Sequence, residues 1–172
     1  MERVELKAKF TEALQKMKQN GMGIGPFSEK NFGNTEGKNS LSYRLSVDSK
    51  GEKIPIRVDH IWGECEESII VWHPIYDFNP AVLTDIKAFI LQNCWKNQCP
   101  NSPFKLAKSN DRREIIFGLK IRVDEIKDGN VADILTADIS RLVEEIPQAK
   151  YLTKKFIEGI GSKNNSRILS TA

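Results

Sequence analysis

Histidine and cysteine are scarce in this sequence, which limits the metal and redox chemistry open to it. Its 172 residues include three cysteines and two histidines. Cys65, Cys94 and Cys99 form no Cys-x-x-Cys pair, and His60, Cys65 and His73 follow one another at irregular spacing, whereas structural zinc ligands usually come in close pairs. An odd number of cysteines without a secretion signal is typical of reduced thiols in a cytoplasmic protein. We therefore expect free thiols, no metal site and a cytoplasmic location.

Long apolar runs and a strong charge of one sign are also missing. The mean hydropathy is −0.42, and no stretch approaches the roughly 18 consecutive apolar residues that a membrane span needs. The first residues are charged and show no signal-peptide core. The formal net charge is +3, from 26 basic and 23 acidic residues, which is by itself too small for a nucleic-acid footprint. These absences argue against a membrane protein and against nucleic-acid binding.

Recognisable catalytic and cofactor motifs are absent from the sequence as well. It has no Gly-x-Ser-x-Gly elbow, no His-Glu-x-x-His motif and no Gly-Lys-Ser/Thr loop. Gly21, Gly23 and Gly25 follow a helical pattern and lead into more loop, whereas a dinucleotide fingerprint needs a strand before its glycines and a helix after them. We therefore expect no cofactor and a protein that is not an enzyme.

What the sequence does contain is clear helical periodicity. Apolar residues recur at three- and four-residue spacing, as in amphipathic helices. Four segments show this pattern: residues 2–20, 80–95, 131–146 and 151–160. Asn79 and Pro80 form a typical helix start, and Pro147 is expected to end the third helix. Residues 161–172 are polar and terminal, so we expect a flexible tail there.

Other segments alternate between apolar and polar residues, which is typical of strands. The predicted strands are residues 41–48, 54–59, 68–73, 104–108 and 114–123. Residues 48–51, which end in Gly51, predict a hairpin turn. Pro55 cannot donate to a ladder, so its strand, or at least that position, is expected at an edge or a bulge. The glycine-rich residues 21–40 predict a long loop.

These elements predict an α+β fold of two layers. Their order is α-β-β-β-α-β-β-α, with an antiparallel sheet of about five strands and helices packed on one face. We expect a single domain over residues 1–160, followed by the tail.

A sheet covered on one face leaves its second face for solvent or another chain, and exposed apolar area there marks an association surface. Two central strands carry apolar residues on both faces. The residues expected on the second face are Ile70, Trp72, Ile116 and Gly118, and the first helix offers Leu6 and Phe10 as another candidate surface. The pattern therefore predicts a dimer or a peptide-binding module.

The order of elements over residues 2–146 resembles the class I type III secretion chaperones and the related YbjN-like proteins. The resemblance includes the segment Ser68-Ile69-Ile70-Val71-Trp72 before the Pro80 helix, and Ile115-Ile116-Phe117-Gly118-Leu119 before the last long helix. It implies a non-enzymatic protein. It also implies a homodimer that holds an unfolded segment of a partner on hydrophobic grooves, or a regulator of the YbjN type.

From the residues and the resemblance we expect a domain that binds a protein or peptide, with no cofactor and no membrane contact. Two alternatives remain open. One is a small-molecule-binding protein or enzyme that uses a pocket beside residues 21–40, which converging polar groups around a cavity would favour. The other is a nucleic-acid accessory protein, which requires the scattered lysines to converge on one face.

Overall fold

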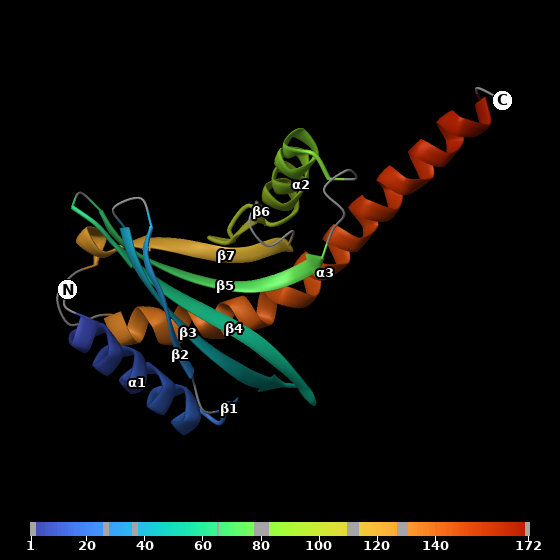
Figure 1. Ribbon diagram of the computed structural model, residues 1–172. Coiled ribbons are helices and arrows are strands. Elements are labelled where there is room, and N and C mark those ends of the chain that lie inside the picture. Colours follow the sequence, from blue (N-terminus) through green and yellow to red (C-terminus); the bar gives the residue numbers. More distant parts are fainter. Residues whose placement is uncertain are drawn as a thin grey trace. The chain divides into compact units, whose positions relative to one another are not determined.

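Strands, three α-helices and one short 3-10 helix make up the described part of the computed structural model (Figure 1). It describes residues 3–25, 28–35, 38–64, 66–77, 83–109, 114–126 and 131–170, with side chains for residues 5–25, 39–64, 66–75, 83–109, 114–126 and 131–159. The strands are β1 (Gly23–Ile24), β2 (Ser28–Thr35), β3 (Lys38–Ser49), β4 (Glu52–Trp62), β5 (Glu67–Asp77), β6 (Lys105–Ser109) and β7 (Glu114–Arg122). The helices are α1 (Arg3–Gln19), α2 (Asp85–Gln98), the 3-10 helix η1 (Val123–Glu125) and α3 (Val131–Ser170).

The chain divides into two compact units, each built from two separate segments. The first unit is Met1–His73 with Gly118–Glu144, and the second is Pro74–Phe117 with Glu145–Ala172. Strands β5 and β7 and helix α3 therefore each contribute residues to both units. Neither unit corresponds to one continuous piece of sequence.

The strands form one seven-stranded sheet in the order β1-β3-β4-β5-β7-β6, with β2 also pairing with β3. The pairs β1–β3, β2–β3, β3–β4 and β4–β5 are antiparallel. An antiparallel sheet with helices is an α+β fold, so the predicted fold class is confirmed.

The hairpin between β3 and β4 forms where the sequence predicts it. Ser49 pairs with Glu52, which leaves Lys50 and Gly51 as a two-residue loop. Both loop residues have positive φ, 51° and 82°, as a hairpin turn matched to the twist of its strands requires.

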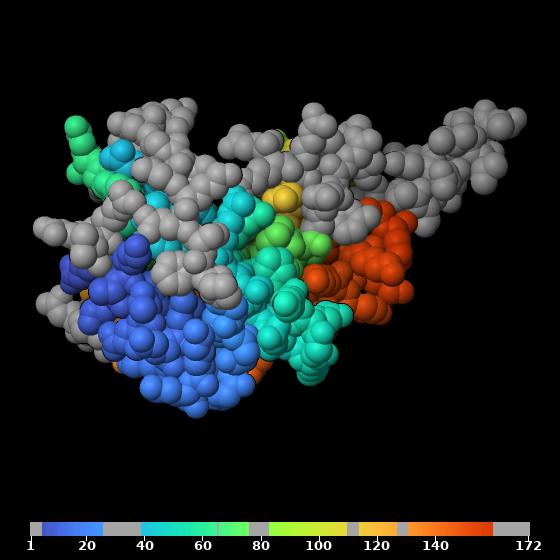
Figure 2. Space-filling model, turned by 60° about the horizontal axis from the view of Figure 1, so that its bottom comes forward, coloured from blue at the N-terminus to red at the C-terminus, as the bar shows by residue number. Residues whose placement is uncertain are grey.

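The core of the first unit lies between alternate strand residues and the apolar side of α1. On β3 and β4 the buried apolar residues are Leu41, Tyr43, Leu45, Val47, Ile54, Ile56 and Val58. On α1 they are Leu6, Phe10, Ala13, Leu14 and Met17. The rings of Phe10 and Tyr43 lie 4.9 Å apart. Figure 2 shows α1, in blue, at the surface of this unit.

Pro55 occupies a position that the ladder tolerates, although β4 is not an edge strand. β4 lies between β3 and β5, but its register with β5 runs only from Arg57 to Trp62. The carbonyl of Pro55 accepts a hydrogen bond from His73 Nδ1 at 2.6 Å instead. The missing N–H of the proline therefore breaks no bond of that register.

The prediction of a long loop over residues 21–40 is wrong for the described part of that segment. β1 and β2 both lie in it and pair with β3, with Gly23 opposite Asp48 and Ser28 opposite Arg44. Glycine and asparagine disfavour strands locally, but hydrogen bonding to an existing strand overrides that preference.

Two helix boundaries also differ from the predictions. α2 begins at Asp85, with Thr84 as its N-cap accepting a hydrogen bond from the Lys87 amide, whereas the predicted start at Asn79 and Pro80 lies outside the described residues. α3 continues through Pro147 to Ser170 as one helix of 40 residues. The predicted break at Pro147 and the separate helix over 151–160 are therefore wrong, and residues 161–170 of the expected tail are helical. Burial of Ile146 and Ala149, at 1% and 0% exposure, supplies packing that offsets the loss of one helical hydrogen bond at proline.

Candidate functional site

The residues predicted on α1 as a partner surface belong to the core. Leu6 and Phe10 are both 0% exposed, and Phe10 packs on Tyr43 of β3. They lie on the side of α1 that the helix needs for its own attachment to the sheet. The structure therefore leaves neither side chain accessible to a partner.

Trp72 and Gly118, predicted on the second face of the sheet, form a structural cluster instead. Trp72 is 5% exposed, its indole Nε1 donates to Asp59 Oδ2 at 2.7 Å, and the Arg57 guanidinium lies 4.7 Å from its ring centroid. A Cβ on Gly118 would lie 2.5 Å from the Trp72 Cβ and would also clash with the Val71 carbonyl. Gly118 is thus needed for close packing of β7 against β5.

Ile70 and Ile116 are half-buried, so neither is a prominent exposed apolar side chain. Ile70 pairs in register with Asp59 of β4, the same carboxylate that receives the Trp72 indole. Ile70 belongs to the first unit and Ile116 to the second. A partner surface at Ile70 and Ile116 therefore stays a prediction.

Among the described side chains, the large apolar ones that are exposed lie mainly on α2, in the second unit. Ile86, Phe89 and Ile90 are 73%, 67% and 45% exposed, and Tyr151 of α3 is 60% exposed. The three α2 residues are spaced i, i+3 and i+4, so they share one side of the helix. We call these three residues the α2 face.

The opposite side of α2 holds the helix in its unit. Leu91 and Trp95 are each 1% exposed. The Trp95 ring contacts Phe117 edge-on with centroids 4.9 Å apart, and its Nε1 donates to the Phe104 carbonyl at 3.1 Å. Because this side already anchors the helix, the α2 face is not needed for local packing.

Two polar contacts complete the attachment of α2 to β6. Gln92 Oε1 accepts a hydrogen bond from the Leu106 amide at 2.6 Å. Lys108 Nζ contacts Asp85 Oδ1 at 2.9 Å. The first contact satisfies a backbone donor of β6, a strand that ends the order of the sheet. Because the Leu106 amide is already hydrogen-bonded, it is less available to pair with a strand of another chain.

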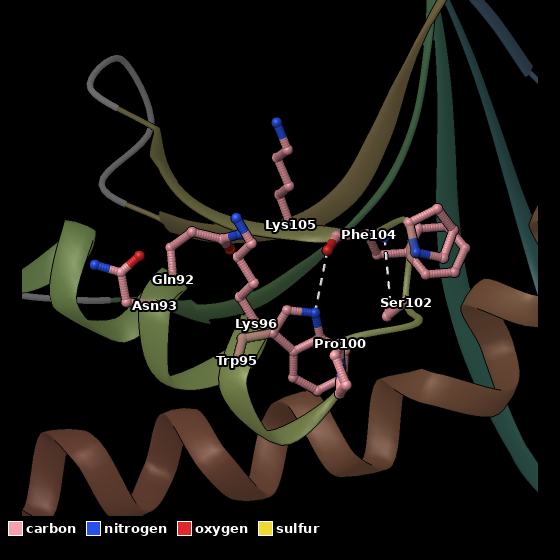
Figure 3. A pocket seen from close by; sticks show the side chains of 9 residues that line it. Gln92, Asn93, Trp95, Lys96, Pro100, Ser102, Phe104 and Lys105 are labelled. Carbon is pink, nitrogen blue, oxygen red and sulfur yellow. Dashed lines mark hydrogen bonds between the residues drawn. The ribbon is translucent and has the colours of Figure 1, made fainter.

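A cavity of about 310 Å³ opens beside the C-terminal half of α2 (Figure 3). It is lined by Gln92, Asn93, Trp95, Lys96, Pro100, Ser102, Pro103, Phe104 and Lys105. Two lysines and no acidic residue line it. Its walls combine apolar rings with a few hydrogen-bonding groups, the composition of small-ligand sites.

A second cavity, of about 400 Å³, lies in the first unit and is mainly acidic. Glu64, Glu66, Glu67 and Asp124 line it together with Arg122, Gly63 and Val123. Glu67 accepts from His60 Nε2 at 2.7 Å. His60 is 1% exposed, and burial lowers its pKa although the Glu67 carboxylate opposes that shift. This pair is tied into the structure of the sheet.

Neither cavity contains a residue of the 21–40 segment. Among the described side chains, no three His, Cys, Asp or Glu residues come together as a metal site. No helix in the described ranges is both long enough and apolar enough to cross a membrane.

Comparisons with known proteins leave the geometry as the basis for any functional conclusion. No protein-family model matches the chain. No curated protein and no solved structure matches it either.

The α2 face was not among the partner surfaces predicted from the sequence. Helical spacing places on one side of the predicted helix the residues Val82, Leu83, Ile86, Phe89, Ile90 and Cys94. Leu83 is buried, but Ile86, Phe89 and Ile90 are exposed. The signal that could have revealed this was the second apolar pair on α2, Leu91 and Trp95, on the opposite side of the helix.

Proposed function

We propose that this chain is a non-enzymatic protein-binding module that forms a homodimer through the α2 face. The observation that carries the proposal is the exposure of Ile86, Phe89 and Ile90 on a helix whose other side is packed. Exposed large apolar side chains gathered on one helix side are typical of an association surface.

Burial of the α2 face would provide a substantial driving force. Covering one large apolar side chain that is otherwise exposed contributes roughly 1.5–3 kcal/mol. A symmetric dimer interface contains these three residues from both copies, so the gain is counted for each copy. Part of this gain offsets the entropy lost on association.

The helix dipole favours a second copy of α2 as the occupant. A two-fold axis near Phe89 would pair the two copies of the helix antiparallel and lay the α2 face of one copy against that of its partner. Antiparallel helices place the positive end of one dipole beside the negative end of the other.

The element order that resembles secretion chaperones and YbjN-like proteins agrees with a dimeric binding module. On this proposal the dimer is the working form and a protein or peptide is its ligand. Fold by itself does not specify that ligand.

The test is the solution mass of the full chain by light scattering over a dilution series. We expect about twice 19.5 kDa for the wild type, and the monomer mass for Phe89→Glu, because the substitution places a charge in the apolar contact. Tyr151→Glu is the matched control, since it makes the same kind of change at an exposed aromatic residue outside α2, and it should remain dimeric. A wild type that is monomeric at every concentration, or a dimeric Phe89→Glu variant, would refute the proposal.

A further inference from the structure

The cavity beside α2 offers a ligand more hydrogen-bond donors than acceptors. Several oxygen atoms around it already accept hydrogen bonds from the protein. Gln92 Oε1 accepts from the Leu106 amide, which leaves the side-chain NH₂ group as the free part of that amide. Ser102 Oγ accepts from the Phe104 amide at 3.2 Å, which leaves its hydroxyl proton to donate outward. The Phe104 carbonyl accepts from the Trp95 indole.

Lys96 adds a positive charge to this set of donors. Among the described residues it forms no ion pair, and no acidic side chain lines the cavity. In Figure 3 the side chains of Gln92 and Lys96 both extend from α2 toward β6, whereas Asn93 points away from that strand. Lys105 of β6 also lines the cavity, but its side chain extends away from α2 in Figure 3. A ligand that fits these groups must offer acceptors and negative charge.

The apolar lining residues and the size of the cavity indicate what kind of group could carry the negative charge. Trp95, Pro100, Pro103 and Phe104 offer apolar surface, against which an aliphatic or aromatic body can pack. A volume of about 310 Å³ is at the small end of ligand pockets, which run from roughly 300 to 1,000 Å³. The site therefore has room for a small organic acid or one peptide residue rather than for a nucleotide.

A single carboxylate suits the site better than a phosphate dianion. The cavity lies at the C-terminal half of α2, where the helix dipole is negative and repels a dianion more than a monoanion. Phosphate sites usually gather backbone amides at a helix N-terminus, and α2 presents the opposite end here, with Lys96 in its last turn.

We propose that this cavity binds a carboxylate carried on a small apolar body, such as the C-terminal residue of a peptide or a free monocarboxylic acid. Lys96 and the Gln92 amide bind the carboxylate, Ser102 donates a further hydrogen bond, and the aromatic and proline walls bind the apolar body. The binding site is separate from the α2 face and does not depend on dimer formation.

Calorimetric titration of the full chain tests this site with defined probes. We expect 3-phenylpropionate to bind roughly tenfold or more tightly than its uncharged amide, 3-phenylpropionamide, because only the acid forms charge-assisted hydrogen bonds. A pentapeptide ending in phenylalanine, compared as free acid and as C-terminal amide, distinguishes the two sources. A preference for the peptide acid over 3-phenylpropionate indicates a peptide terminus, and the reverse indicates a small acid.

Two matched variants locate the binding. Lys96→Gln should weaken 3-phenylpropionate binding about tenfold, whereas Lys150→Gln, the same change at an exposed lysine of α3, should leave it unchanged. Ile86→Glu, which places a charge in the α2 face at the end farther along the helix from the cavity, should also bind normally, so a failure of the dimer proposal is separable from a failure of this one. Equal affinity for acid and amide, no effect of Lys96→Gln, or no binding of any probe at millimolar concentration would each overturn the proposal.

Discussion

The indole Nε1 of Trp95 donates a hydrogen bond to the carbonyl of Phe104 at 3.1 Å, in a buried position. This bond ties α2 to the segment that enters β6. It orients the side of the helix that carries Leu91 and Trp95 toward the rest of the second unit and thereby leaves the α2 face exposed. Both proposals about α2 depend on this anchoring.

Trp95→Phe tests the importance of that anchor. The variant keeps an aromatic ring but leaves the buried Phe104 carbonyl without its donor, so we expect a loss of about 1–3 kcal/mol in the free energy of unfolding. Urea denaturation provides the measurement. Trp62→Phe is the control, because Trp62 is half-buried and its indole makes no comparable hydrogen bond within the described part of the chain. Equal losses in the two variants would contradict the assigned role of Trp95.

Gly118→Ala should destabilise the protein because the new Cβ meets Trp72 Cβ at 2.5 Å. We expect a decrease of about 1–3 kcal/mol in the free energy of unfolding, typical of overpacking. Gly159→Ala is the matched control, since nothing lies within 4 Å of its added Cβ and alanine favours a helix by roughly 0.5–1 kcal/mol. The two substitutions should therefore shift the unfolding midpoint in opposite directions.

The buried imidazole of His60 predicts a loss of stability in mild acid. Burial lowers the pKa of His60 from its ordinary value of 6.5, so the unfolded chain binds a proton there at a higher pH than the folded chain does. The contribution of His60 to stability is therefore present above that ordinary value and is lost as the pH falls toward the lowered folded value. Urea unfolding of wild type and His60→Gln from about pH 8 to about pH 5 gives the comparison. If both proteins lose stability equally over that range, His60 is not the responsible group.

Asp138 on α3 predicts the opposite pH dependence. Burial raises its pKa from the ordinary value of 3.8, and Arg141 only partly opposes the shift. The folded state therefore favours the protonated acid, and stability is lost as the pH rises from 3.8 through the raised folded value. Asp138→Asn should accordingly be more stable than wild type at neutral pH, with the difference disappearing in acid. A variant that is less stable than wild type at neutral pH would show that the carboxylate forms a stabilising interaction.

The sequence predicted correctly those helices and strands whose buried side is set by a single apolar stripe or by a local turn. The β3–β4 hairpin formed around Lys50 and Gly51, and α1 packs through Leu6 and Phe10 because its apolar residues form a single stripe. The same stripe was also offered as a partner surface, which its burial excludes. A helix with one apolar side has only one way to bury it.

The candidate site could not be predicted in the same way, because α2 has apolar residues on two sides. Periodicity identifies such sides but does not decide which one finds a partner inside the fold. Trp95 is buried because Phe104 and Phe117 lie against it, and those residues come from later in the chain. The cavity likewise needs α2 and the segment before β6 together.

By itself the sequence determined the α+β class, most of its strands and the hairpin turn, because these follow from side-chain alternation and from backbone preferences within a few residues. Only the tertiary structure decided that residues 23–24 and 28–35 join the sheet, that α3 continues through Pro147, and that Phe89 is exposed while Trp95 is buried. Each of these outcomes depends on contacts between distant segments, and such contacts can override a local preference of about 1–3 kcal/mol.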